Sequence, residues 1–449
     1  MAKIFDKTHF LKYAKNTNWL ILEKLLQIIS GVFVGLYVVR YLGAERFGML
    51  SYAQSAVVLF NTLTFLGITE VITRELIADF KLQQKILGTA LILRLIGGGL
   101  FLISMLCYIF FYEQDIQTRW IIGIISFGYF FNSFDIVIYY FQAKVISDRK
   151  VKAYLVALSI GAILKLVFIF LELPLIYFAV ALAAENIILV IGLLVGYQLE
   201  SEDLFKWEFD KIVAQRLILT ALPLLISNGL MSIYMRIDQL MIEKILQDNA
   251  LNGYYAAAVR LSEMWYFVPL SICASVFPAI LHAKASDEKR YKIRLQQLFD
   301  VLGWFAILVA LFCFLFSDWI ILLACGKEYA PSAEILTIHI IGGFFISIGA
   351  VSGKWIYAEK LEKIVFFRTL LGAIVNIILN WYFLPIYGIK GAAWATVISY
   401  LLVYTISNLF HKKLIELVLF QIRIFTFPFR INQFIQTYLE EKKKKQEKE

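Results

Sequence analysis

The residues of this chain that could do chemistry are charged side chains inside long apolar runs. The densest set comprises Arg236 and Asp238 and, beyond a short polar break, Arg260 and Glu263. A charged side chain in a bilayer is expensive, so it normally faces a water-filled space or a partner of opposite charge. Because the planar guanidinium of arginine donates two parallel hydrogen bonds to phosphate, these residues predict an anionic ligand inside a membrane protein.

The cations within the apolar runs lie at several depths, and together they predict a positively lined cavity. The candidate substrate-binding residues are Lys24, Arg94, Lys165, Arg236 and Arg260. Acids in the same runs are candidate proton or ion-coupling sites, or ion-pair partners: Glu23, Asp135, Glu185, Asp238 and Glu263. The alternative is that each cation extends to an interface or makes a structural ion pair.

Local spacing suggests partners for some of these charges. Glu23 is placed to neutralise the adjacent Lys24, and Glu263 follows Arg260 by three residues on one helical face. Asp238 is two residues from Arg236, so the two side chains point to different faces. Asp238 is therefore available to meet Arg260 or to bind H⁺ or Na⁺. The sequence contains no catalytic constellation, no glycine-rich phosphate loop and no metal-ligand spacing.

The composition places these charges in a polytopic membrane protein. The 449 residues are 60% hydrophobic and 17% charged, against about 25% charged in soluble domains. Apolar runs of about 20 residues recur from end to end, each long enough to cross a bilayer as a helix. The first run, which begins at Trp19, is too long for a signal peptide and is interpreted as a retained helix.

The apolar runs predict twelve spans and an orientation. The spans are 17–40, 47–69, 86–112, 119–142, 153–171, 174–197, 216–244, 254–281, 296–325, 332–356, 364–386 and 391–411. With both termini cytoplasmic, 31 of the 43 lysines and arginines fall in internal segments and 6 in external ones. This distribution accounts for the net charge of +9 without nucleic acid. The external loops are too short for an enzyme that builds glycans outside the membrane.

A weak internal repeat predicts how the spans are grouped. Polar turns that lead into a Tyr/Ala-rich helix occur around Gly48 and around Gly253. Two parallel six-helix lobes are therefore expected, at 1–205 and 206–411. A basic, amphipathic cytoplasmic tail covers 412–449: an apolar stretch at 414–427 is too short to span, and a later stripe beyond residue 428 ends in Lys442 to Lys445, suited to anionic lipid.

The order of several loosely patterned stretches resembles the Wzx-type O-antigen and capsule repeat-unit flippases of the multidrug/oligosaccharidyl-lipid/polysaccharide (MOP) superfamily. These stretches cover nearly the whole chain: Arg40-Tyr-Leu-Gly43, Phe47-Gly48 and Ser51-Tyr52-Ala53, Gly67 to Glu75, Phe131 to Phe134 with Tyr140-Phe141-Gln142, Arg236-Ile-Asp238, Gly253 to Glu263, Gly326 to Leu336, and Asn376 to Thr396. The individual stretches are unspecific, and their order and spacing are what indicate the family.

The resemblance implies a fold and a substrate. The fold would be MATE-like, with two six-helix lobes in a V shape around a central cavity, working by alternating access. The substrate would be an undecaprenyl-diphosphate-linked oligosaccharide, carried across the bacterial inner membrane. Polysaccharide polymerase and chain-length machinery would be partners beside membrane lipids. No cofactor is expected, and H⁺ or Na⁺ is expected as the coupling ion.

Three other functions stay open at this point. A multidrug cation antiporter would share the fold, although interior cations would repel a cationic drug. A peptidoglycan-precursor flippase would need the same chemistry for its diphosphate. A membrane glycan polymerase or ligase is disfavoured by the short external loops.

Overall fold

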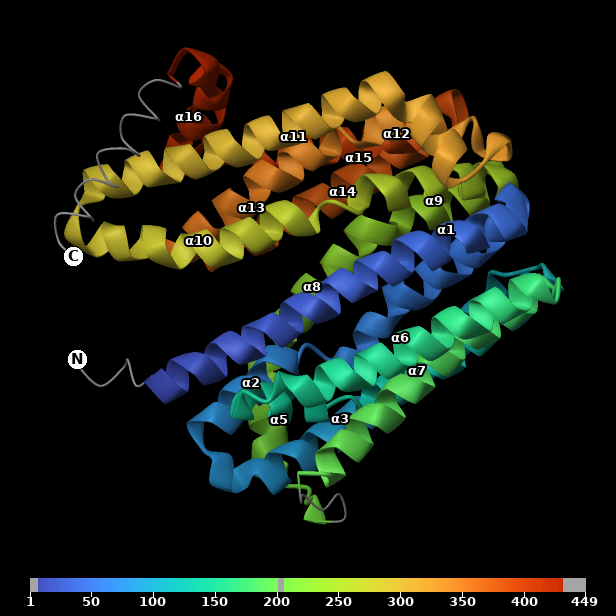
Figure 1. The fold of residues 1–449 in the computed structure, drawn as a ribbon, viewed down its shortest axis with the longest axis horizontal. Helices are drawn as coiled ribbons and strands as arrows, with labels where there is room; N and C mark the ends of the chain where they lie inside the picture. The colour runs from blue at the N-terminus through green and yellow to red at the C-terminus, as the bar shows by residue number, and fades with distance from the viewer. Residues whose placement is uncertain (1–6, 201–205, 431–449) are drawn as a thin grey trace. The chain divides into compact units, whose positions relative to one another are not determined.

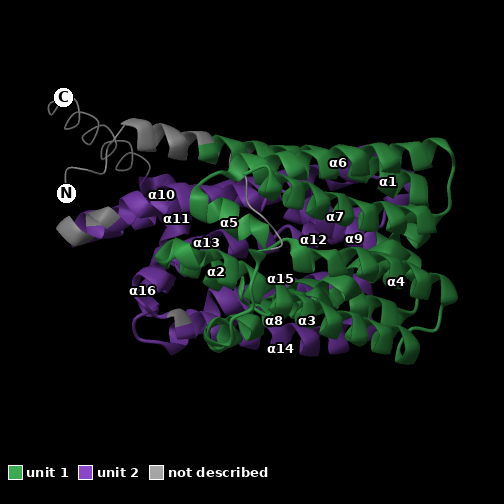
Figure 2. Cartoon of the chain, turned by 90° about the horizontal axis from the view of Figure 1, so that it is seen from below, with its two compact units in different colours: residues 1–253 green, residues 254–449 purple. Residues whose placement is uncertain are grey.

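The computed structural model describes residues 7–200 and 206–430, and within these ranges every regular element is an α-helix or a 3-10 helix (Figure 1). This confirms the predicted all-α class. The chain forms two compact units, residues 1–253 and 254–449 (Figure 2). The predicted lobes 1–205 and 206–411 rest on the internal repeat and stay a prediction, as do the V shape and the central cavity. The later tail stripe and Lys442 to Lys445 lie outside the described residues.

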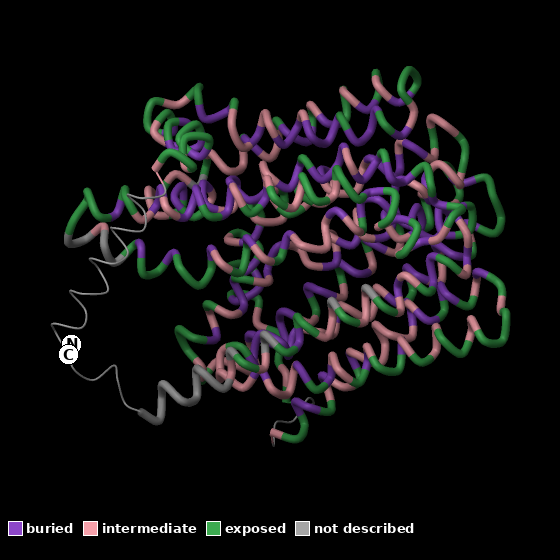
Figure 3. The backbone as a smooth tube through the Cα atoms, turned by 45° about the horizontal axis from the view of Figure 1, so that its top comes forward, coloured by how far each residue is buried: buried purple, intermediate pink, exposed green. Residues whose placement is uncertain are grey.

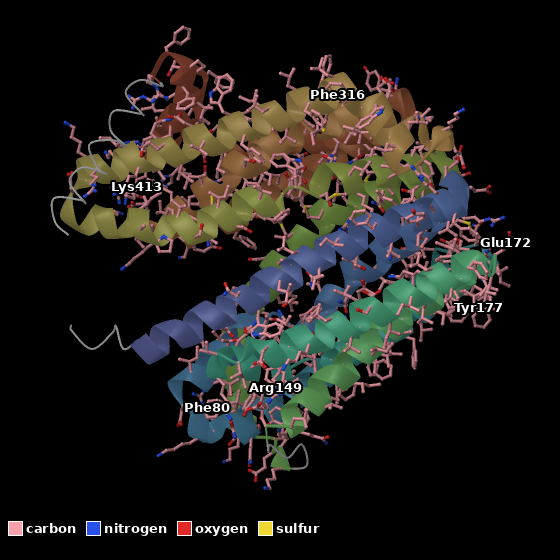
Figure 4. All side chains as sticks on the ribbon, viewed as in Figure 1. Phe80, Arg149, Glu172, Tyr177, Phe316 and Lys413 are labelled. Carbon is pink, nitrogen blue, oxygen red and sulfur yellow. The ribbon has the colours of Figure 1, made fainter. Side chains whose placement is uncertain are left out.

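The described residues of unit 1 form eight α-helices and the start of a ninth. They are α1 (Lys7–Phe65), α2 (Thr69–Ala78), α3 (Gln83–Phe111), α4 (Ile116–Phe130), α5 (Val137–Lys144), α6 (Ser147–Phe170), α7 (Leu175–Gln198), α8 (Lys211–Leu246) and the first residues of α9 (Asn249–Glu263). Figure 4 shows Glu172 and Tyr177 at one end of the α6–α7 hairpin and Arg149 at its other end. These two ends correspond to the predicted outer and inner sides of the hairpin.

The described residues of unit 2 form the rest of α9 and seven further α-helices. They are α10 (Phe267–Ser286), α11 (Glu288–Ala324), α12 (Ser332–His339), α13 (Gly342–Ala358), α14 (Glu362–Tyr387), α15 (Ile389–Tyr404) and the short α16 (Ile415–Arg423). The apolar stretch at 414–427, too short to span, therefore forms a helix of its own.

The described helices include ten that are long and apolar enough to cross a membrane, or eleven if the bent pair of α4 and α5 is one span. The predicted count of twelve is not confirmed. The first predicted span, 17–40, and most of the second, 47–69, lie within α1, which ends at Phe65; the two are joined at Gly43 with φ 70° and ψ 173°. Because glycine adopts positive φ at no steric cost, the chain turns there without leaving the helical hydrogen-bond pattern for more than a residue. In Figure 1 the chain runs out along α1 and returns, so that α2 lies near the end where α1 begins.

Aspartate side chains cap the N-termini of three described helices, α4, α8 and α11. Asp115 accepts a hydrogen bond from the backbone N–H of Thr118 (2.7 Å), and Asp210 and Asp287 cap α8 and α11 in the same way. Such caps satisfy backbone donors that have no partner inside the helix. Partial burial tends to raise the pKa of Asp115, but the hydrogen bonds from Thr118 outweigh it and hold the pKa below its usual value.

Burial follows the pattern expected of helices in lipid. Each unit has a buried core: Leu87, Tyr140 and Leu217 belong to that of unit 1, and Leu302 and Trp355 to that of unit 2. Many large apolar side chains of the spanning helices are exposed, and Figure 3 shows exposed residues along the length of these helices. A soluble monomer rarely exposes so much apolar surface, so the faces that carry these side chains are the ones that contact lipid.

Backbone contact joins the two turns that suggested an internal repeat. A Cβ atom built on Gly48 would lie 1.8 Å from the carbonyl oxygen of Asn249, and one built on Gly253 would lie 1.9 Å from the carbonyl oxygen of Ala44. The two glycines therefore let the turn in α1 and the start of α9 touch backbone to backbone. The repeat itself stays a prediction.

From these turns, α8 runs antiparallel to the second part of α1. The Ser55 hydroxyl donates to Gln239 Oε1 at 2.6 Å, and the hydroxyls of Thr62 and Ser232 hydrogen bond at 2.9 Å. Hydroxyls that face another helix find partners that lipid cannot offer. These contacts form a polar seam along the interior of unit 1.

The predicted orientation gives a direct expectation for reporter fusions. Fusions at Asp115, Asp248 and Lys327 should report the outside of the cell, whereas fusions at Lys150 and Lys289 should report the inside, because the lysine and arginine bias holds their loops there. Paired phosphatase and fluorescent-protein reporters check each site. An outside signal from Lys289 contradicts the topology.

Candidate functional site

Arg94 is the most deeply buried of the predicted cations. Its side chain on α3 is 0% exposed, and its Nη2 atom donates to Asp135 Oδ1 at 2.6 Å and to the Asn132 carbonyl at 2.5 Å. The guanidinium carbon lies 4.3 Å from the centroid of the Phe65 ring. Arg94 is thus held by an ion pair and a cation–π contact rather than left open to a ligand in this structure.

A break in the fourth predicted span supplies both acceptors of Arg94. α4 ends at Phe130, a 3-10 turn covers Phe131–Phe134, and α5 begins at Val137, with a bend of 42°. Non-helical backbone at membrane depth is tolerated where it is buried in protein. Asn132 and Asp135 lie in this break, so the pair with Arg94 fastens the broken span to α3.

Lys165 and Glu185 form a second interior pair. Lys165 Nζ of α6 donates to Glu185 Oε2 of α7 at 2.7 Å, and both side chains are partly buried. Gly161 makes room for this contact, since a Cβ atom there would lie 2.7 Å from the same carboxylate oxygen. Two predicted site residues are therefore brought together across neighbouring helices.

Arg236 is a half-buried cation of α8 with no acidic partner among the described residues. Within the described ranges no carboxylate oxygen lies within 4.0 Å of its guanidinium. Tyr129 on α4 lies near enough to both Arg236 and Glu185 for their charges to act on its hydroxyl. We call Tyr129, Lys165, Glu185 and Arg236 the Arg236 cluster. It carries two cations against one acid, so it suits an anionic group.

The charges near the start of α1 pair differently from the sequence-based expectation. Glu23 is buried and lies 3.2 Å from Lys150 Nζ of α6, whereas Lys24 is exposed and donates to Gln27 Oε1 at 3.1 Å. The partner of Glu23 is thus Lys150 rather than Lys24, because a helix places neighbouring residues on different faces.

The remaining predicted residues lie on α8 and α9, before and after the division of the chain at Gly253. Asp238 is buried on α8 in unit 1. Arg260 is exposed near the end of α9 in unit 2, and Glu263 ends that helix half-buried. Their pairing with one another, and their roles toward substrate or coupling ion, stay predictions.

A polar network that the sequence reasoning missed lies at the predicted outer end of unit 1. Glu113 Oε2 accepts hydrogen bonds from the Tyr52 hydroxyl at 2.8 Å and from Lys244 Nζ at 3.1 Å. The Tyr52 hydroxyl also lies 2.7 Å from that of Tyr108. Glu113 and Lys244 belong to two loops that the predicted topology places on the outer side of the membrane. Two opposite charges on the same side were the sequence signal that could have predicted this ion pair.

Comparison with solved structures identifies the fold. The fold is similar to that of a multidrug resistance MATE family transporter of the MOP superfamily in its inward-facing conformation, with a TM-score of 0.71 and 14% identity over 89% of this chain and 95% of that one. It is also similar to the lipid II flippase MurJ, with a TM-score of 0.68 and 15% identity over 94% and 93% of the two chains. The chain thus has the fold of a MOP-superfamily transporter, which confirms the MATE-like expectation.

The family follows from the sequence match. Residues 13–284, more than half of the chain, match the family described as polysaccharide biosynthesis protein, and the chain belongs to that family. Residues 223–382 match the family MatE. A probable low-salt glycan biosynthesis flippase of Haloferax volcanii is 24% identical over 155 residues, and the match spans only about a third of that relative, 32% of its length. The chain is therefore a membrane protein of the polysaccharide biosynthesis family, with the fold of the MOP-superfamily transporters.

Proposed function

We propose that this protein moves undecaprenyl-diphosphate-linked oligosaccharide repeat units, of an O-antigen, capsule or exopolysaccharide, from the inner to the outer leaflet of the bacterial cytoplasmic membrane. The observation that carries the proposal is Arg236, a half-buried cation in a spanning helix without a carboxylate partner in the described chain. The family match and the glycan flippase of Haloferax volcanii support a glycan-bearing substrate.

The three parts of such a substrate make different physical demands. The diphosphate needs cationic groups, for which Arg236 offers a planar, bidentate donor. The glycan needs a hydrated, polar path. The prenyl tail is apolar and can remain in lipid while the head group crosses.

Alternating access coupled to an H⁺ or Na⁺ gradient would drive the transfer, with both termini in the cytoplasm. Acids inside a transporter span are suited to such coupling. Asp238 is a candidate because it is buried on the same helix as Arg236 and points to another face. Glu263 is a second candidate. The other three acids already form ion pairs with side chains in this structure: Asp135 with Arg94, Glu185 with Lys165, and Glu23 with Lys150.

Two alternative substrates are each supported by one structural likeness. A multidrug substrate fits the likeness to the MATE transporter, and a peptidoglycan precursor fits the likeness to the lipid II flippase. The net positive charge of the Arg236 cluster opposes a cationic drug. It does not separate the two diphosphate lipids, which share the same charged group.

Purified protein in sealed vesicles tests the proposal directly. Fluorescent undecaprenyl-diphosphate oligosaccharide, lipid II and a cationic dye are offered in parallel, and the label that reaches the opposite leaflet is measured by chemical quenching. We expect transfer of the oligosaccharide lipid above the other two. Transfer of the dye alone contradicts the proposal, and equal transfer of lipid II would widen the substrate class.

Arg236→Ala should lower oligosaccharide-lipid transfer by about 10- to 100-fold, since a hydrogen-bonded contact to a charged group contributes about 1.5–3 kcal/mol. Arg236→Lys should retain part of the activity, because lysine keeps the charge and loses the planar fork. The initial rate of transfer in vesicles with matched protein content measures both.

A matched control comes from the neighbouring pair. The double variant Lys165→Ala/Glu185→Ala removes one charge of each sign, so it leaves the net charge of the Arg236 cluster unchanged and should impair transfer less.

Arg260→Ala is the corresponding test for unit 2. Substantial recovery in Arg260→Ala/Glu263→Ala or Arg260→Ala/Asp238→Ala would assign Arg260 to a structural pair. Full activity of Arg236→Ala removes the basis for the proposed diphosphate contact.

A further inference from the structure

The chain after α15 does not form a loose tail as far as residue 430, but packs onto unit 2. Leu417, Phe420 and Ile424 are buried in the core of unit 2. Ile424 sits against Gly303 of α11, where an added Cβ atom would lie 2.7 Å from it. α16 is therefore an integral part of unit 2.

Polar contacts fix the same segment at several points. Trp304 Nε1 donates to the Ile424 carbonyl at 2.9 Å, and Gln421 Nε2 donates to the Tyr404 carbonyl at 2.9 Å. Arg430 closes the segment by an ion pair with the buried Asp300 at 3.1 Å. Buried side-chain hydrogen bonds of this kind hold a helix in one register.

The opposite face of this segment is apolar and uncovered. Five large residues recur at helical spacing with exposed fractions between 43% and 90%: Ile415, Leu419, Ile422, Phe425 and Phe429. They form one stripe, roughly opposite the buried face at 100° per residue. In Figure 1 α16 lies beside the first half of α11 with its axis across that of α11, so α16 does not run in the direction in which α11 spans the bilayer.

Exposed cations border the stripe. Lys412 and Lys413 precede α16, and Arg423 is adjacent to Ile422. In the described residues none of the three has a carboxylate within 4.0 Å. Figure 4 shows Lys413 at the same end of unit 2 as α16, and Phe316 toward the other end of α11. A helix with an apolar stripe and a cationic border is suited to the boundary between headgroups and acyl chains.

We propose that the exposed face of α16 is a docking surface for anionic phospholipid. The apolar stripe lies in the outer part of the acyl-chain layer, and Lys412, Lys413 and Arg423 contact the phosphate headgroups. Since the cations of this segment lie on the predicted cytoplasmic side, the lipid is that of the inner leaflet. The surface adds a lipid-binding role that does not depend on the substrate.

A fluorescent amino acid incorporated at Leu419 in the full chain reports the surroundings of the stripe. In bilayer discs, lipids brominated on their acyl chains should quench it, and aqueous iodide should leave it bright. Spin-labelled phosphatidylglycerol should quench it more readily than spin-labelled phosphatidylcholine. The mole fraction of labelled lipid that gives half-maximal quenching should be lower by roughly 5-fold for each cation that contacts a headgroup.

The variant Lys412→Gln/Lys413→Gln/Arg423→Gln should lose this preference for phosphatidylglycerol while the brominated lipids still quench the label. The control variant Lys81→Gln/Lys206→Gln/Lys211→Gln removes three exposed cations of unit 1 and should keep the preference. Quenching by iodide with no quenching by brominated lipid overturns the proposal and indicates a water-exposed or protein-covered face. An unchanged preference in the Lys412 variant also overturns it.

Discussion

Replacing Asp135 by alanine should lower the free energy of unfolding by about 3–5 kcal/mol, because it leaves Arg94 buried without its counter-charge. The guanidinium is 0% exposed and its other acceptor is a backbone carbonyl, which cannot neutralise it. The loss is measured from titration with sodium dodecyl sulfate in mixed micelles, followed by circular dichroism.

Two further variants test whether the fall in the free energy of unfolding comes from the unpaired charge of Arg94. Arg94→Met/Asp135→Leu should recover most of the stability, since replacing a buried ion pair by apolar residues of similar size is often neutral. Asp148→Ala removes a more exposed pair with Lys152 and should change stability by less than about 1 kcal/mol. If Asp135 serves mainly as a coupling-ion site, its alanine variant keeps its stability and instead loses the ion dependence of transport.

Gly253→Leu should destabilise the chain by about 3 kcal/mol, the upper part of the range for overpacking. A side chain at this position meets the Ala44 carbonyl at 1.9 Å, and backbone cannot move aside by a change of rotamer. Gly48→Leu should behave alike, because its contact with the Asn249 carbonyl is equally close. The midpoint of thermal unfolding in detergent measures the effect.

The control for the glycine variants is Gly99→Leu on α3. An added Cβ atom at Gly99 meets no atom within 4 Å, so this variant should unfold near the wild-type temperature. Equal stability of Gly253→Leu and Gly99→Leu would show that the two turns do not touch in the protein.

The sequence predicted the helical class and most spans because hydropathy is a local property of the chain. It did not predict the pair between Arg94 and Asp135, which depends on the break after Phe130. The residues of that break, Phe131 to Ile136, include no proline or glycine, so nothing local marks it.

Contacts between helices could not be predicted from the sequence either. Lys165 lies closer to the turn at Glu172 than Glu185 does, so a simple hairpin does not place them side by side. The docking of α16 needed the room that Gly303 leaves on another helix. The charged residues themselves were identified from the sequence, because their cost inside a membrane makes each one conspicuous.

The seam between α1 and α8 has a consequence for biosynthesis. Ser55 and Thr62 enter the membrane early, while their partners Gln239 and Ser232 are synthesised more than 150 residues later, at sequence separations of 184 and 170. Until α8 is inserted, these hydroxyls lack the hydrogen-bond partners that they have in the finished protein. A chain that stops before residue 211 should therefore expose these hydroxyls to lipid or to other helices, so its α1 should be less stably packed than in the full-length protein.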